Sequence, residues 1–212
     1  RGAGRAQHGR RARPVAGQDV THTMRLDFES AARGGKRRIS LLRGGDERSI
    51  EVTIPPAVRD GAKLRIRGEG HPSPTPGGAP GDLILTIRVE PHPVLVRGRP
   101  GDPPDSLDLS LELPLTIAEA TLGCRVQVPT LDGPVDLNVP PGAASGKYLR
   151  LRERGLENAA GRRGDLYARV RVVPPDGSGL APGEAETLRR IAERTPALRT
   201  GPGWPTSRGA AA

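Results

Sequence analysis

Four histidines and one cysteine are the residues of this chain that could serve as metal ligands or nucleophiles. A zinc-protease site needs two histidines one helical turn apart with a glutamate beside the first, and no pair here has that spacing. His71 and His92 each precede a proline, which favours turns over ligands. Cys124 matches Gly35 of an internal repeat described below, which favours a small core residue. The sequence therefore predicts no catalytic residues, no metal, no cofactor and no enzymatic activity.

Two further patterns could bind phosphate or transfer protons. Residues 142–148 resemble a phosphate-binding loop, but the first glycine lies too close to Gly146, and Tyr148 stands where a Ser or Thr would bind magnesium. Asp82 and Asp165 each follow a glycine at the start of an apolar run. A carboxylate at such a position accepts backbone N–H groups, so we expect both aspartates to be structural.

The basic residues form another candidate site, because the net charge of +9 favours polyanionic partners. Residues 1–18 hold five arginines and no acidic residue, whereas the remaining body is nearly neutral. Such an arm can contact phosphates, which makes DNA binding one hypothesis. Its candidate DNA contacts are Arg5, Arg10, Arg11 and Arg13. The alternative is a disordered linker whose arginines reflect a GC-rich genome.

Period-two alternation of apolar and polar residues predicts strands along most of the body. Four leucines alternate with polar residues over 107–113, and similar runs occupy 50–54 and 83–89. Pro and Gly fall between the runs, as expected for turns. Short helices are expected near residues 29–33 and 116–122, and a longer one near 183–194. No apolar run approaches the roughly 18 residues that span a bilayer, so we expect no membrane partner.

The body is duplicated, because residues 54–67 match residues 139–152 without a gap, about 85 residues apart. The sequence therefore predicts an all-β protein with two similar β-sandwich domains in tandem and a short C-terminal helical dimerisation segment. The predicted parts are a basic disordered arm (1–18), a first repeat (19–93), a second repeat (94–175), a helical segment (176–195) and a disordered tail (196–212).

Apolar residues at alternating positions suggest a second use for such sandwiches. A strand at the edge of a sheet exposes unpaired N–H and C=O groups, which can pair with an extended peptide. In the first repeat Met24 alternates with Leu26, and Ile39 alternates with Leu41. The alternative interpretation places all of these residues in the core. Met24 is the most suggestive, since methionine adapts to varied ligands.

The order of the motifs resembles the C-terminal substrate-binding region of DnaJ-type co-chaperones over roughly residues 19–195. The motifs are Ala31-Ala-Arg-Gly34, Ile54-Pro-Pro56, Gly81-Asp-Leu83, His92-Pro93, Val128-Pro-Thr-Leu-Asp-Gly133, Pro140-Pro-Gly142 and Gly164-Asp-Leu166. The chain is most similar to the zinc-free branch, which includes proteins that bind curved DNA, since the Cys-x-x-Cys repeats of the other branch are absent.

The resemblance implies a cytoplasmic homodimer that holds unfolded client polypeptides on the first repeat and delivers them to a DnaK-type chaperone. Carried over position by position, the client-binding groove uses Met24, Ile39, Leu41, Leu95 and His22. Leu95 replaces a usual phenylalanine and His22 a usual aliphatic residue, which implies a less aromatic and more polar groove.

Two further expectations follow from the resemblance. The sequence contains no His-Pro-Asp tripeptide, so this chain alone is expected to bind clients without stimulating the partner's ATPase. At the C-terminal end Leu188 and Ile191 share one face of the expected helix and are the candidate dimerisation residues. Capping of the second repeat by this helix is the alternative.

Overall fold

The computed structural model describes residues 15–43 and 46–194, and their secondary structure is mostly strand. In the first repeat the elements are β1 (Val20–Leu26), α1 (Phe28–Arg33), β2 (Gly35–Arg43), β3 (Asp46–Ile54), β4 (Lys63–Ile66) and β5 (Leu83–Val89). They are followed by β6 (Val96–Arg97), β7 (Leu109–Thr116), α2 (Ile117–Leu122), β8 (Cys124–Val128), β9 (Val135–Val139), β10 (Tyr148–Leu151) and β11 (Leu166–Val173). A 3-10 turn, η1 (Gly177–Gly179), and the helix α3 (Pro182–Glu193) come last. The predicted all-β class is confirmed.

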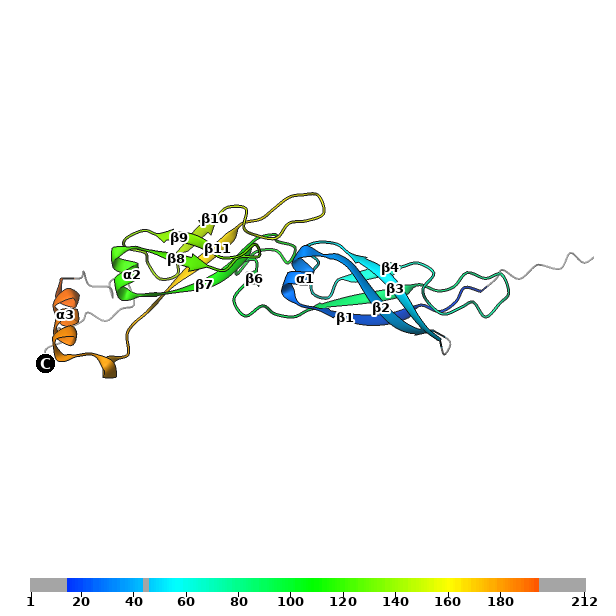
Figure 1. Ribbon diagram of the computed structural model, residues 1–212, viewed down its shortest axis with the longest axis horizontal. Coiled ribbons are helices and arrows are strands. Elements are labelled where there is room, and N and C mark those ends of the chain that lie inside the picture. The colour runs from blue at the N-terminus through cyan, green and yellow to red at the C-terminus, as the bar shows by residue number, and fades with distance from the viewer. Residues whose placement is uncertain (1–14, 44–45, 195–212) are drawn as a thin grey trace, which may run out of the picture.

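Each repeat combines one sheet with one hairpin (Figure 1). The first sheet has the order β1-β5-β4, in which β1 is parallel and β4 antiparallel to β5. The second has the order β10-β11-β7-β6, with β7 parallel to β11 and both β10 and β6 antiparallel to their neighbours. The hairpins are β2–β3 and β8–β9, and each lies over the sheet of its own repeat.

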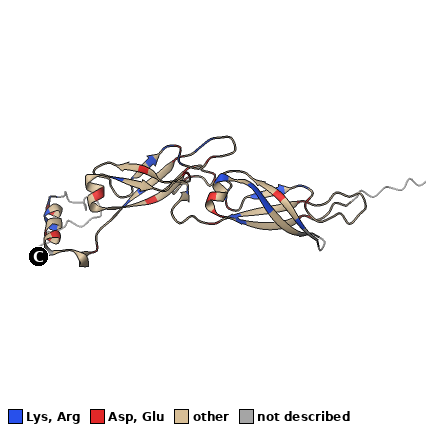
Figure 2. Ribbon diagram, in the orientation of Figure 1, with Lys and Arg blue, Asp and Glu red and all other residues tan. Residues whose placement is uncertain are grey.

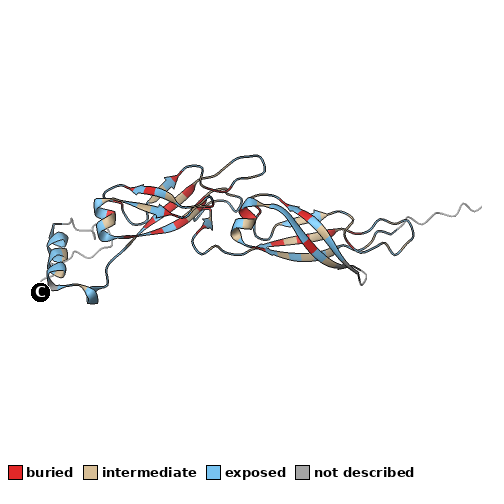
Figure 3. Ribbon diagram, in the orientation of Figure 1, coloured by how far each residue is buried: buried red, intermediate tan, exposed pale blue. Residues whose placement is uncertain are grey.

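Burial alternates along the strands because one face of each sheet packs against the hairpin (Figure 3). In the first repeat the buried face of β5 carries Leu83, Leu85 and Ile87, all at 0% exposure. These residues pack with the hairpin in one hydrophobic cluster. A second cluster, around β7 and β11, fills the second repeat and also includes Ala32 from α1. Two layers around one core per repeat define the predicted sandwiches.

The duplication read from the sequence extends to individual hydrogen bonds. Asp82 Oδ1 accepts from the backbone N–H of Gly68 at 2.8 Å, and Asp165 Oδ1 accepts from that of Glu153 at 2.8 Å. The same matching holds for backbone bonds, because Val20 N donates to the Asp82 carbonyl and Leu109 N to the Asp165 carbonyl. The structural role expected for the two aspartates is therefore confirmed.

The short helices begin where the sequence supplies N-caps. Asp27 accepts from Ser30 N at 2.7 Å, and hydrogen bonding by the Ser30 side chain and backbone lowers the pKa of the Asp27 carboxyl. Thr116 forms a reciprocal capping box with Glu119. Both helices end at a glycine with positive φ, Gly34 at 65° and Gly123 at 81°. At Gly34 a Cβ would meet the Ile54 carbonyl oxygen at 2.6 Å, so a larger residue does not fit there.

Two guanidinium groups connect the repeats. Arg33 Nη2, on α1, donates to the Leu131 carbonyl at 2.7 Å, and Arg97 Nη2, on β6, donates to the Ala57 carbonyl at 2.7 Å. Lysines and arginines are spread over both repeats, including β2 and β10, and many pair with carboxylates (Figure 2).

The two ends of the described chain differ from each other in their contacts. Residues 15–18 were expected to belong to a disordered arm, but Gly17 N donates to the Ala79 carbonyl and Val15 N to Thr75 Oγ1. Residues 15–18 are therefore hydrogen-bonded to the first repeat. At the other end, α3 projects beyond the second repeat (Figure 1). Among the described residues no helix is long and apolar enough to cross a membrane.

Candidate functional site

Strand β1 leaves one edge of the first sheet open, since among the described residues it pairs only with β5. Successive N–H groups of a strand point to opposite sides. Because Val20 N donates toward β5, the N–H groups of Thr21, Thr23 and Arg25 point toward the open edge. The strand contains no proline, so all three donors are present. This edge can accept a further strand.

The face of β1 that turns toward the hairpin is only partly covered. Val20, His22 and Met24 on this face are half-buried, and full burial is reached only at Leu26. Met24 and Leu41 pack against the same hydrophobic cluster, which includes the buried Ile39. The structure thus brings together three of the predicted groove residues, with His22 beside Met24 on the same face of β1.

The remaining predicted groove residue, Leu95, lies elsewhere. It is 2% exposed and packs in the second hydrophobic cluster, at the junction of the repeats. Ile39 is also 7% exposed, so it supports the groove from beneath more than it offers surface. The assignment of all five residues to client binding stays a prediction, and Met24, Leu41 and His22 are the members with side-chain surface to offer.

Leu95 owes its position to a turn held by a histidine. His92 Nδ1 accepts from the backbone N–H groups of Val94 and Leu95, at 3.0 and 2.9 Å. The His92 ring also contacts Phe28 on α1, with ring centroids 5.6 Å apart. These bonds agree with the turn inferred from the His-Pro sequence, and they turn the chain from β5 toward β6.

The corresponding edge in the second repeat is obstructed. The matched hydrogen bonds of Val20 and Leu109 align β1 with β7, so that Met24 corresponds to Leu113 and Arg25 to Pro114. Strand β6 pairs with β7 at Ser110 and Leu109. Pro114 has no N–H to offer on the outward side, which is how natural proteins block sheet edges.

The aspartates that open the last strand of each repeat are held by ion pairs as well as backbone bonds. Asp82 faces Arg65 at 2.5 Å, and Asp165 faces Arg150 at 2.5 Å. The N–H of Gly68 and the Arg65 guanidinium hold the pKa of Asp82 below its usual value. Both carboxylates therefore close the turns that precede the last strand of each repeat.

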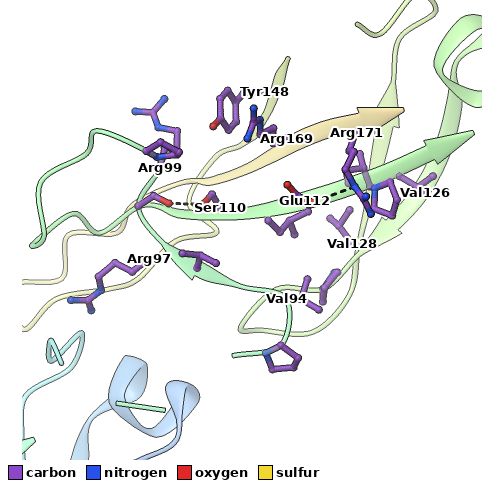
Figure 4. Close-up of a pocket in the computed structure, with 18 of the residues that line it drawn as sticks. Val94, Arg97, Arg99, Ser110, Glu112, Val126, Val128, Tyr148, Arg169 and Arg171 are labelled. Atoms are coloured by element: carbon purple, nitrogen blue, oxygen red, sulfur yellow. Dashed lines mark hydrogen bonds and ion pairs between the residues drawn. The ribbon is translucent and has the colours of Figure 1, made fainter. Parts of the chain in front are cut away.

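A wide groove in the second repeat was missed by the sequence reading. It has a volume of about 1080 Å³ and lies beside β7, beyond the end of β6 (Figure 4). Its rim carries Arg97, Arg99, Arg169 and Arg171. The signal for this groove in the sequence was the alternation of Arg169 and Arg171 along β11. This pattern does not by itself reveal the aliphatic residues that also line the groove.

The other candidate residues from the sequence are Cys124, the two apolar residues of α3 and the arginines of the arm. Cys124 begins β8 half-buried, and burial raises the pKa of its thiol, which disfavours a reactive thiolate. Among the described residues no group of three or more His, Cys, Asp or Glu side chains could hold a metal. Leu188 is half-buried and Ile191 is 56% exposed on α3. The arm residues Arg5, Arg10, Arg11 and Arg13 lie outside the described residues.

Comparison with known proteins agrees with this architecture. The family model for the DnaJ C terminal domain matches residues 20–175. A Curved DNA-binding protein of Pseudomonas putida (strain W619) is 39% identical over 173 residues, which cover 76% of this chain and 52% of that protein. Chaperone protein DnaJ 2 of Synechocystis is 39% identical over 184 residues, or 86% of this chain and 53% of that protein.

Chaperone protein DnaJ of Brevibacillus choshinensis is 41% identical over 147 residues, or 69% of this chain and 36% of that protein. The chain belongs to the DnaJ C-terminal domain family. It spans about half the length of the first two curated relatives described. The predicted family resemblance is confirmed.

Proposed function

We propose that this chain is the client-holding region of a DnaJ-type co-chaperone and binds extended apolar segments of unfolded polypeptides along β1. The observation that carries the proposal is the contrast between the open edge of β1 and the obstructed edge of β7. Outward N–H groups of β1 supply bonds that do not depend on client sequence. The relatives named as DnaJ chaperones support this role.

Side-chain surface next to the edge supplies the second half of the binding energy. Met24 and Leu41 are partly exposed above the buried Ile39, so an apolar client side chain that enters here removes further apolar area from water. His22 adds a polar group to the same face of β1. The site therefore suits short apolar side chains at alternating client positions, with a polar neighbour tolerated at His22.

The decisive experiment replaces the exposed residues and spares the core. We expect Met24→Ser with Leu41→Ser to lower the affinity for a labelled, extended apolar peptide by about tenfold or more, measured by fluorescence anisotropy. Suppression of aggregation of a heat-denatured model protein should fall in parallel. Ile39 is left unchanged because it is 7% exposed and its loss would destabilise the repeat.

Val172→Ser is the matched control, since Val172 is a partly buried aliphatic residue packed against the other hydrophobic cluster. Normal binding by a folded double variant, or equal loss in the control, contradicts the groove assignment. Circular dichroism and urea unfolding establish that each variant is folded.

Two partnerships complete the proposal. Clients bound at β1 are passed to a DnaK-type chaperone, which a transfer assay with labelled client checks directly. The chain forms a homodimer through α3, where Ile191 presents an exposed apolar side chain. Sedimentation should show a dimer that becomes a monomer when residues beyond Gly179 are deleted. A dimer that survives the deletion excludes α3 as the interface.

DNA binding by the arginine-rich arm is a second candidate function, supported by the name of the Pseudomonas relatives. Removal of residues 1–14 is the appropriate truncation, because residues 15–18 are hydrogen-bonded to the first repeat. Loss of several arginine–phosphate contacts should weaken duplex DNA binding and flatten its dependence on salt. Undiminished DNA binding by the truncated chain rejects this function.

A further inference from the structure

The groove beside β7 combines an apolar floor with an open approach. Val126 and Val128 of β8 and Leu111 and Leu113 of β7 contribute to its lining (Figure 4). Val96 at its mouth is 59% exposed, although it is aliphatic. Because β6 pairs with β7 at only two positions, β7 from Leu111 onward has no strand on this side among the described residues. Of the four lining residues named, Val126 offers partly exposed aliphatic surface to a ligand, whereas Val128, Leu111 and Leu113 are buried.

The rim of the groove is cationic. Four arginines and one glutamate line it, and that glutamate, Glu112, pairs with Arg171 at 3.2 Å. Arg99 pairs with Asp102 at 3.1 Å and lies 4.1 Å from the centre of the Tyr167 ring. Arg169 lies between these two pairs on the outer face of β11, and no carboxylate of the described residues is within ion-pair distance of it. The rim therefore carries more positive charge than the neighbouring carboxylates neutralise.

The first repeat lacks this feature at the equivalent positions. Matched bonds of Gly61 N to the Ile87 carbonyl and Gly146 N to the Val170 carbonyl align β5 with β11. Thr86 then stands where the second repeat has Arg169, and Arg88, the counterpart of Arg171, is paired with Asp60. The unpaired charge is therefore a property of the second repeat.

We propose that this groove binds an extended peptide segment of a partner protein in which apolar side chains alternate with carboxylates. Alternate side chains of an extended chain point to opposite sides, so apolar groups can contact Val126 while carboxylates face Arg169. Hydrogen bonds between a guanidinium and a carboxylate are among the strongest in proteins. This inference goes beyond the proposed function, because it concerns another site and another ligand chemistry.

Other occupants fit less well. Residues 1–14 and 195–212 of this chain contain arginines and no acidic residue, so neither terminal segment complements the rim. Single-stranded nucleic acid needs aromatic side chains on which bases stack, and Tyr148 is the one aromatic residue that lines the groove. The aliphatic floor instead suits a peptide.

The test uses a labelled synthetic peptide of alternating valine and glutamate, and a second peptide with glutamine in place of glutamate. Fluorescence anisotropy with the full chain should show tighter binding of the valine–glutamate peptide, and added salt should reduce the difference. We expect Arg169→Glu to weaken binding of this peptide about tenfold and to leave the glutamine peptide nearly unaffected. Arg169→Thr, which copies the first repeat, should give a smaller loss.

Arg152→Glu is the matched control, since Arg152 is exposed, forms no ion pair with the described residues and lies outside the groove. Equal binding of the two peptides, or equal loss in the Arg152 and Arg169 variants, overturns the proposal. Displacement of the peptide by duplex DNA in an Arg169-dependent manner assigns the rim to nucleic acid and also overturns it. So does a dimer, in sedimentation, that dissociates on Arg169→Glu.

The outcome is separable from that of the proposed function. The double variant of Met24 and Leu41 should lose binding of apolar clients and retain binding of the valine–glutamate peptide. Arg169→Glu should show the reverse. If both variants affect both ligands equally, one shared site replaces the two that we infer, and the inference about the second groove fails.

Discussion

Strands β1 and β7 occupy the same place in two copies of one fold, yet their surroundings differ. The inner face of β7 carries Leu109, Leu111, Leu113 and Leu115, all buried. The inner face of β1 has half-buried residues at the first three of these positions. The β7 edge is partly covered by β6 and contains a proline, whereas β1 pairs on one side only among the described residues. Each repeat therefore has a corresponding strand edge, and only the edge of β1 is suited to pairing with a further strand.

The hairpins of the two repeats also differ, and the hairpin of the first repeat is the longer one. Strands β2 and β3 have nine residues each, whereas β8 and β9 have five. Gly35 corresponds to Cys124, because each pairs with the last residue of the following strand. The first hairpin therefore continues past Ile39, where the second ends at Val128, and Leu41 lies on this extension. In the client-binding site that we propose next to β1, this longer hairpin would provide one side.

The largest effect is expected when the two inner faces are truncated. Leu113→Ala should lower the free energy of unfolding by about 2–5 kcal/mol, since a fully packed leucine is lost. Met24→Ala at the equivalent position should cost about 1 kcal/mol, because Met24 is only partly buried. Urea unfolding measures both. Equal costs would show that the face of β1 is core and not groove.

Exchange of the edge residues should alter client binding next. Arg25→Pro removes one outward N–H of β1 and copies the residue found in β7, so the fold is expected to survive. We expect about tenfold weaker binding of an extended apolar peptide, measured by anisotropy. Pro114→Thr is the reciprocal control and should leave that binding unchanged. Unaltered affinity of the Arg25 variant argues against strand addition at β1.

A smaller gain is expected from His22→Leu. This substitution gives β1 the residue that β7 has at Leu111, and leucine buries more apolar area against a client than imidazole. Affinity for the apolar peptide should rise about threefold. Binding of the valine–glutamate peptide in the second groove serves as the internal control. A fall in apolar affinity would mean that His22 contributes a hydrogen bond to the client.

The smallest expected effect is a difference between the two repeats in how much stability they lose at low pH. Asp60 Oδ1 accepts from Val89 N at 2.9 Å, and this bond lowers the pKa of Asp60, whereas Ser145 Oγ accepts the equivalent bond from Val172 N. A carboxyl whose pKa is lowered by folding stabilises the fold above its unfolded pKa and loses this effect as the pH falls. Asp60→Ser should therefore reduce the loss of stability below about pH 4. Urea unfolding at several pH values checks this, with Ser145→Ala as the control. An unchanged acid profile contradicts the role of Asp60.

Much of the fold followed from the sequence because strand periodicity, punctuation and repetition are local signals. The expected helices near residues 29–33, 116–122 and 183–194 agree with α1, α2 and α3. The turn-closing role of Asp82 and Asp165 also followed, since the same Gly-Asp pair opens the last strand of each repeat. Both inferences were strengthened because the two repeats carry the same pattern.

The parts that could not be predicted depend on which strands become neighbours. Nothing local indicates that Val96 and Arg97 would pair with β7, or that Arg169 would line a groove without a carboxylate partner among the described residues. The same reason explains Leu95, whose neighbour in sequence is the first repeat but whose side chain packs in the second. A family resemblance assigns a role to a position in the sequence, whereas the burial of that position depends on the surrounding fold.

The paired bonds of Arg33 and Arg97 across the junction have a consequence for long ligands. They run in opposite directions between the repeats, one ending on Leu131 and the other on Ala57, and so oppose both bending and twisting of the junction. If both proposed sites bind ligand, their fixed separation would make the chain a bivalent receptor. A polypeptide anchored in one groove has a raised effective concentration at the other, provided that its intervening length matches the gap. Client selection by such a receptor would depend on the spacing of segments as well as on their composition.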